Sequence, residues 1–122
     1  MRVVVGIGAR MGVDAADVMR VISTVLQQNW QVEAIASIDR KAELVAAVAA
    51  SMGVRGLTYS AEQLSAVPTA TNSQRVQDAV GSASVAVASV LLAGAAGQLL
   101  VPRTVDGRVV VAVAEAAANL SR

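Results

Sequence analysis

Short Val-rich runs alternate with longer amphipathic stretches in the first part of the chain. Residues 2–7 are apolar and rich in Val, which is typical of a buried strand. Residues 14–28 predict a helix, because Asp14 can cap the first turn and apolar side chains recur at helical spacing. These side chains are Val18, Val21, Ile22 and Val25. The chain therefore opens with a strand that is followed by a helix.

The same alternation continues toward the C-terminus. Strands are predicted over 33–38 and 54–59, a helix over 40–52 that stops at Gly53, and a further helix after Ser60. Beyond these, we expect a loop over 68–72, helices over 73–80 and 84–93, and strands over 98–101 and 108–114. Asp106 and Gly107, which lie between the last two strands, are a hairpin-turn signal.

This order of elements predicts the α/β class. Alternating strands and helices favour a parallel sheet, and the terminal hairpin adds antiparallel pairing. We expect a three-layer α/β/α sandwich with a mixed, largely parallel sheet and an antiparallel hairpin near the C-terminus. The 122 residues are enough to bury a core, so the chain 1–122 is expected to form a single domain.

Composition excludes several kinds of site. The chain has no His and no Cys, which excludes disulfides, the usual structural zinc sites and nucleophilic machinery of the Ser-His-Asp or Cys-His kind. We expect no metal and no cofactor. The net charge is only +1 and no basic run is longer than Arg40-Lys41, so binding to nucleic acid is not expected.

The stretch from Ala79 to Pro102 carries no charge and is long enough to span a bilayer. It contains several Gly and Ser residues, Gln98 and much Ala, so we interpret it as a buried helix followed by a buried strand, with no membrane association. The apolar residues after Arg2 are interrupted by Arg10, which is not the pattern of a signal peptide. A cytoplasmic location is therefore expected.

Polar side chains follow the predicted strands. Gly6, Gly8 and Arg10 end the first strand, where a Gly-x-Gly turn would let a ligand approach the backbone and Arg10 would grip a carboxylate or phosphate. Ser37, Asp39 and Lys41 follow the second strand, Tyr59 and Ser60 the third, and Arg103 the fourth. Ligands bind beyond the carboxyl ends of parallel strands. We expect Arg10, Lys41 and Arg103 to gather there around a ligand with several carboxylates or phosphates.

Other interpretations of the same residues stay open. The glycines can simply form a tight turn, Arg10 and Lys41 can be solvated surface residues, and Asp39 can be the N-cap of the second helix. The spacing of Gly6, Gly8 and Gly12 also occurs in some dinucleotide sites, with Asp39 or Arg40 as the ribose partner. A nucleotide-binding α/β domain is therefore an alternative, although the chain is short for two mononucleotide-binding halves.

Taken together, these segments resemble the CobE family, which is also the C-terminal domain of the CbiG proteins of cobalamin biosynthesis. The resemblance covers nearly the whole chain and rests on the order and spacing of several segments. These are Gly6–Gly12, Ser37–Lys41, Tyr59–Leu64, Val67-Pro68, the pattern over Ser73–Gly81, Ser84–Ala86, Leu100–Arg103 and the closing Val-rich strand. Two positions depart from the family pattern: Ala9 stands where the family often has Cys, and Val87 stands where a Glu is common.

The resemblance implies a protein of cobalamin biosynthesis that binds a precorrin or corrinoid intermediate, whose acetate and propionate groups suit a cationic rim. Binding would use Gly6, Gly8, Arg10, Ser37, Asp39, Lys41 and Arg103. One alternative is an enzyme that acts on the precorrin macrocycle by lactone opening or C–C hydrolysis, with Asp39 as general base. Another is an interaction module whose partners are other cobalamin-pathway enzymes.

Overall fold

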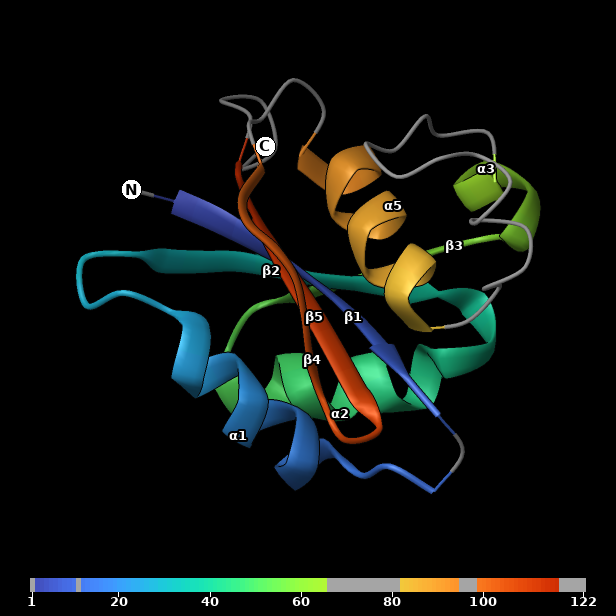
Figure 1. The fold of residues 1–122 in the computed structure, drawn as a ribbon, viewed down its shortest axis with the longest axis horizontal. Coiled ribbons are helices and arrows are strands. Elements are labelled where there is room, and N and C mark those ends of the chain that lie inside the picture. Colours follow the sequence, from blue (N-terminus) through green and yellow to red (C-terminus); the bar gives the residue numbers. More distant parts are fainter. Residues whose placement is uncertain (1, 11, 66–81, 95–98, 117–122) are drawn as a thin grey trace.

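The computed structural model describes residues 2–10, 12–65, 82–94 and 99–116, which form one sheet with helices on both faces (Figure 1). The strands are β1 (Arg2–Ala9), β2 (Gln31–Ile38), β3 (Arg55–Tyr59), β4 (Leu99–Asp106) and β5 (Val109–Glu115). The helices are α1 (Ala15–Val25), the 3-10 turn η1 (Asp39–Lys41), α2 (Ala42–Met52), α3 (Ala61–Ser65) and α5 (Ser82–Gly94). The predicted loop over 68–72 and helix over 73–80 lie outside the described residues.

The sheet has five strands in the order β3-β2-β1-β5-β4. β1, β2 and β3 are parallel to one another, and β5 is antiparallel to both β1 and β4. β4 therefore runs in the same direction as β1. Gly107 adopts a φ of 62° in the turn between β4 and β5, which confirms the predicted hairpin. The prediction of a mixed, largely parallel sheet with an antiparallel hairpin is also confirmed.

The two faces of the sheet carry separate cores. Val3, Val5 and Ile7 of β1 pack with the buried side chains of α1 and α2, whereas Val4 packs with those of α5. The order of the strands explains this division. From β1 through β2 to β3 the chain moves toward one edge of the sheet, and the connection from β3 to β4 crosses back to the other edge. Because crossover connections between parallel strands keep the same hand, connections that move in opposite directions place their helices on opposite faces. The three-layer α/β/α sandwich is the result (Figure 1).

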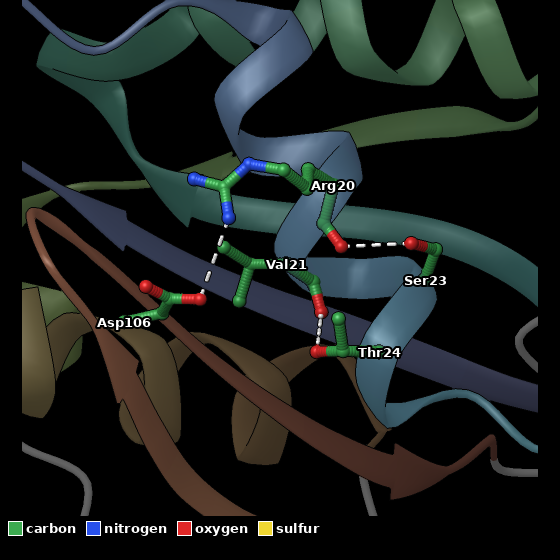
Figure 2. Close-up of polar contacts among 5 residues, drawn as sticks. All are labelled: Arg20, Val21, Ser23, Thr24 and Asp106. Atoms are coloured by element: carbon green, nitrogen blue, oxygen red, sulfur yellow. Dashed lines mark hydrogen bonds and ion pairs between the residues drawn. The ribbon is translucent and has the colours of Figure 1, made fainter.

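Helix α1 begins as expected and ends early. The Asp14 side chain accepts a hydrogen bond from the Asp17 N–H at 3.0 Å, which confirms the predicted N-cap. The helix stops at Val25, although residues up to 28 were predicted to continue it. In its last turn the Ser23 and Thr24 hydroxyls donate to carbonyls three residues earlier, at 2.7 and 2.6 Å (Figure 2). Such local bonds weaken a helix terminus, and Leu26 is already extended.

The second helix begins later than predicted. Residues Asp39–Lys41 form the 3-10 turn η1, and α2 starts only at Ala42. Lys41 occupies the N-cap position of α2 and makes no side-chain capping bond. The interpretation of Asp39 as the N-cap of this helix is therefore wrong. The predicted stop at Gly53 is confirmed, since that residue is left-handed with a φ of 71°.

Two described parts of the uncharged stretch form the helix α5 and the first residues of the edge strand β4. In α5, Ala86, Ala88 and Val90 are buried, so the expected buried helix is confirmed. Across the described ranges, none of the helices combines the length and apolar character that a membrane crossing requires. The strand that follows, β4, extends to Asp106, which is five residues beyond the predicted end at Val101.

Candidate functional site

The carboxyl ends of β1 and β2 lie next to each other. The two strands are parallel neighbours, with Val5 opposite Ile35 and Gly6 opposite Ala36. Arg10, which follows β1, and the turn Asp39–Lys41, which follows β2, therefore come to the same end of the sheet. We name this end the carboxyl edge and define it by Arg10, Asp39–Lys41, Tyr59 and Gly107–Arg108.

Charged groups of the carboxyl edge are accessible. Arg10, Asp39 and Arg40 are exposed, and Lys41 is half-buried. An exposed guanidinium keeps its charge at no desolvation cost and offers a fork of N–H donors that matches a carboxylate or phosphate. The edge can therefore bind anions, and Asp39 adds one negative charge beside the basic pair Arg40-Lys41.

Gly6 and Gly8 lie inside β1, so the predicted Gly-x-Gly turn is wrong. The strand continues to Ala9, and Gly8 pairs with Val110 of β5. A Cβ on Gly6 would lie 2.1 Å from the Ala86 carbonyl oxygen and 2.9 Å from Val90 Cβ. Gly6 thus lets α5 pack against the sheet. The glycine in the turn after β1 is instead Gly12, which has a φ of 86°.

Ser37 lies within the sheet. Its side chain is fully buried, and its hydroxyl donates a 2.7 Å hydrogen bond to the Ile7 carbonyl oxygen. Ser89 of α5 has a similar role, because its hydroxyl contacts the Ala36 and Ala86 carbonyl oxygens at 3.3 and 3.1 Å. Both hydroxyls satisfy buried polar atoms between β1, β2 and α5. The Ser37 hydroxyl thus links β2 to β1 through its hydrogen bond to Ile7.

Arg103 does not follow the fourth strand as predicted, because it lies within β4, three residues before Asp106. The neighbouring residue Thr104 is opposite Val111, which in turn is opposite Ile7. Arg103 is therefore level with the middle of β1 and separated from it by β5. The prediction that Arg103 follows its strand failed because the uncharged stretch gave no sign that the strand would continue through Pro102.

Tyr59 is the last residue of β3, and its side chain lies on the α5 side of the sheet. It is half-buried and packs with the cluster formed by Ile38, Leu64 and Ala88. Burial raises the pKa of the Tyr59 hydroxyl above its ordinary value of 10.0, and the charge of Arg55 partly opposes this shift. Ser60 then begins α3 with reciprocal bonds to Gln63, at 2.9 and 3.1 Å, as the capping-box pattern predicts.

The connections after β2 and β3 leave the sheet on opposite faces. β2 leads into α2, which shares a core with α1, whereas β3 leads into α3, whose Leu64 packs with Ala88 of α5. In open α/β sheets, ligands bind where the connections of neighbouring strands diverge in this way. The divergence lies at the carboxyl edge, beside Asp39–Lys41 and Tyr59.

One residue of the carboxyl edge was not predicted. Arg108, in the turn between β4 and β5, accepts a 3.1 Å hydrogen bond at its carbonyl oxygen from the Arg10 N–H. The hairpin signal indicated that Arg108 lies near a turn, but only the pairing of β5 with β1 brings it to Arg10. Among the residues that the structure describes, no group of three or more His, Cys, Asp or Glu side chains gathers as a metal site would require.

Comparisons with known proteins agree with this fold. The model of the family described as "Cobalamin synthesis G C-terminus" matches residues 3–114. The cobalamin biosynthesis protein chiG from Agrobacterium tumefaciens is 32% identical, with a TM-score of 0.64, and the match covers 93% of this chain and 98% of that one. No curated protein matches this sequence.

Two further solved structures share the fold at lower identity. CobE, a protein from the cobalamin biosynthetic pathway, is 23% identical with a TM-score of 0.72, over 92% of this chain and 88% of that one. A Sulfolobus solfataricus protein described as a cobalamin biosynthesis protein G homolog is 22% identical with a TM-score of 0.73. That match covers 93% of this chain and 36% of the longer one.

Proposed function

Because the chain belongs to the family of cobalamin synthesis G C-terminal domains, we propose that it binds a precorrin or corrinoid intermediate at the carboxyl edge. One observation carries this proposal: β1 and β2 are parallel neighbours, so the segments that hold Arg10 and Lys41 reach the same edge. The resemblance that the sequence suggested is confirmed at the level of the family. The proposal goes beyond family membership in two respects, the class of the ligand and the position of its binding site.

The chemistry of the ligand suits this edge. Intermediates of this pathway carry acetate and propionate groups around the macrocycle, and they are therefore polyanions at neutral pH. Arg10, Arg40 and Lys41 offer cations at one end of the sheet. A charge-assisted hydrogen bond contributes roughly 1.5–3 kcal/mol, and less where solvent screens it. Several such contacts made together support useful affinity.

Paired corrinoids test whether charge drives binding. Cobyrinic acid keeps free carboxylates on the corrin ring, whereas the corresponding groups of cobinamide are amides. We expect the wild-type protein to bind cobyrinic acid in a spectroscopic titration and to bind cobinamide much more weakly. Equal affinity for the two ligands would contradict a site that recognises carboxylates.

Variants locate the site. We expect the double variant Arg10→Ala, Lys41→Ala to bind cobyrinic acid at least ~30-fold more weakly, which corresponds to about 2 kcal/mol. The matched control is Arg2→Ala, Arg55→Ala, which removes two cations from the starts of β1 and β3, at the opposite end of the sheet. If both double variants lose the same affinity, or neither loses any, ligand binding at the carboxyl edge is wrong.

A further inference from the structure

Tyr59 is held in place where the connections after β2 and β3 diverge. It is opposite Ile38 in the parallel pairing of the two strands, and Asp39, the first residue of η1, follows Ile38 directly. β3 then leads into α3 beside α5 (Figure 1). The Tyr59 side chain packs with Ile38, Leu64 and Ala88, which belong to β2, α3 and α5. Because three elements already hold this side chain, a ligand that contacts it pays little to order it.

The hydroxyl groups near this divergence differ in what they contact. The Ser37 hydroxyl donates to the Ile7 carbonyl oxygen, and Ser60 Oγ accepts a hydrogen bond from the Gln63 N–H. Among the residues that the structure describes, none forms a hydrogen bond with the hydroxyl of Tyr59. The described residues also contain no buried side-chain oxygen or nitrogen without a partner, so the Tyr59 hydroxyl is accessible from the surface. It can therefore meet a ligand.

This hydroxyl keeps its proton at neutral pH. Burial raises the pKa of Tyr59 above 10.0, and the charge of Arg55 only partly opposes the shift. A neutral phenol offers one O–H donor, whereas an ionised carboxylate can only accept. A hydrogen bond to an ionised acceptor is shorter and stronger than one between neutral groups. Tyr59 can thus bind a carboxylate oxygen without bringing a charge of its own.

The charged groups of the carboxyl edge lie on the other side of the divergence. η1 carries Arg40 and Lys41 and leads into α2 on one face of the sheet, whereas Tyr59 lies on the α5 face. A ligand between these two connections meets cations on one side and a neutral donor on the other. Charges attract over a distance and in many orientations, but a hydrogen bond needs a short distance and an aligned donor. Tyr59 is therefore suited to orient a ligand that the cations attract.

We propose that the Tyr59 hydroxyl donates a hydrogen bond to a carboxylate oxygen of the ligand and so determines how the ligand is oriented at the carboxyl edge. This inference rests on the proposed function, since the carboxylate is a peripheral group of the macrocycle. Tyr59 selects which of the several carboxylates lies beside β3, while Arg10 and Lys41 supply the long-range attraction.

Substitutions at two neighbouring residues separate the hydroxyl from the ring. Tyr59→Phe removes only the oxygen and keeps the ring between β2, α3 and α5, whereas Tyr59→Leu removes the ring as well. Thr58→Val is the matched control. Thr58 is exposed, and neighbouring side chains of a strand point to opposite faces of the sheet. This variant therefore loses a hydroxyl that faces away from the proposed contact.

The first test is a titration with cobyrinic acid at low and at high salt. We expect Tyr59→Phe to bind about 10-fold more weakly than the wild-type protein at both salt concentrations, which corresponds to about 1.4 kcal/mol. A short, partly buried contact is screened little. The loss in Arg10→Ala, Lys41→Ala should instead shrink as salt rises, because exposed charges are screened. Thr58→Val should bind as the wild-type protein does.

The second test observes the hydroxyl in the wild-type protein. The chain has one Tyr, so isotope-labelled tyrosine gives one set of ring NMR signals, whose chemical shifts follow ionisation. A carboxylate that accepts the Tyr59 proton favours the neutral phenol over the phenolate. Saturating cobyrinic acid should therefore move the midpoint of the Tyr59 titration to higher pH. An unchanged or lower midpoint overturns the proposed hydrogen bond.

The titrations distinguish this inference from the proposed function. If Tyr59→Phe binds like the wild-type protein while Arg10→Ala, Lys41→Ala loses affinity, the hydroxyl contact is wrong and the proposed function stands. Weaker binding by Tyr59→Leu alone also overturns the hydroxyl contact, because the ring then carries the interaction. If only Tyr59→Phe loses affinity, the hydroxyl contact stands and the cationic site fails. If the wild-type protein does not bind cobyrinic acid, both are wrong.

Discussion

Replacing Gly6 with Ala tests how closely α5 packs on the sheet. The added methyl group would lie 2.1 Å from the Ala86 carbonyl oxygen and 2.9 Å from both Ser89 Oγ and Val90 Cβ. Ordinary contacts between such atoms are about 3.5 Å, so α5 would have to retreat by roughly 1.4 Å. The nearest atom belongs to the helix backbone, and therefore no side-chain rotation relieves the clash.

The cost of this retreat follows from the packing of α5. Ala86, Val90 and Ala93 are almost completely buried against the sheet, so moving the helix loosens the whole interface. Overpacking a core costs typically about 1–3 kcal/mol, and we expect Gly6→Ala to cost about 3 kcal/mol. With a urea m-value of about 1.5 kcal/mol/M, this loss lowers the unfolding midpoint by about 2 M.

Equilibrium urea unfolding measures this change, followed by far-ultraviolet circular dichroism and by the fluorescence of Trp30, the chain's one Trp. Gly53→Ala is the matched control, because Gly53 has a φ of 71° and no atom within 4 Å of an added Cβ. That variant should lose only about 1 kcal/mol, from the strain of the left-handed conformation. If Gly6→Ala is no more destabilising than Gly53→Ala, the close approach of α5 to β1 is refuted.

Three further results are expected. Ser37→Ala should lower the free energy of unfolding by about 2 kcal/mol, because it leaves the buried Ile7 carbonyl oxygen without its 2.7 Å partner; an unchanged urea midpoint would contradict this. Tyr59 is the one Tyr of the chain, so tyrosinate absorbance reports it alone, and its midpoint should lie above pH 10.0. Since folding raises this pKa, the associated stability is complete below pH 10 and is lost as the pH rises through the folded-state pKa; a midpoint at or below 10.0 refutes the burial argument. Affinity for cobyrinic acid should fall as salt rises while that for cobinamide stays constant, and a salt-independent titration would exclude an electrostatic site.

Local patterns predicted the elements well where neighbouring residues decide the outcome. The Asp14 cap, the Gly53 stop, the Ser60 capping box and the hairpin at Gly107 are all present. Each depends on contacts within a few residues, which the sequence displays directly. Two helix ends were also mispredicted, since α1 stops at Val25 and α2 begins only at Ala42. The strand predictions failed where the outcome depended on distant strands. β1 continues through Gly6 and Gly8 because β5 pairs with it, and β4 continues through Arg103 because it pairs with β5.

The family and the α/β class follow from the order of segments along the chain, since spacing and periodicity are properties of the sequence itself. Only part of the candidate site could be predicted in this way. Arg10 and Lys41 could be expected at one edge, because consecutive parallel strands tend to be neighbours. Arg108 could not be placed beside Arg10, since the insertion of β5 next to β1 joins residues that are far apart in the chain. Likewise, Gly6 looked like a ligand-binding glycine until the position of α5 showed which atoms its missing side chain would have met. The pairing of β5 with β1 decided the position of Arg108, and the packing of α5 decided the role of Gly6. Both contacts form only in the assembled sheet, so the sequence alone did not show them.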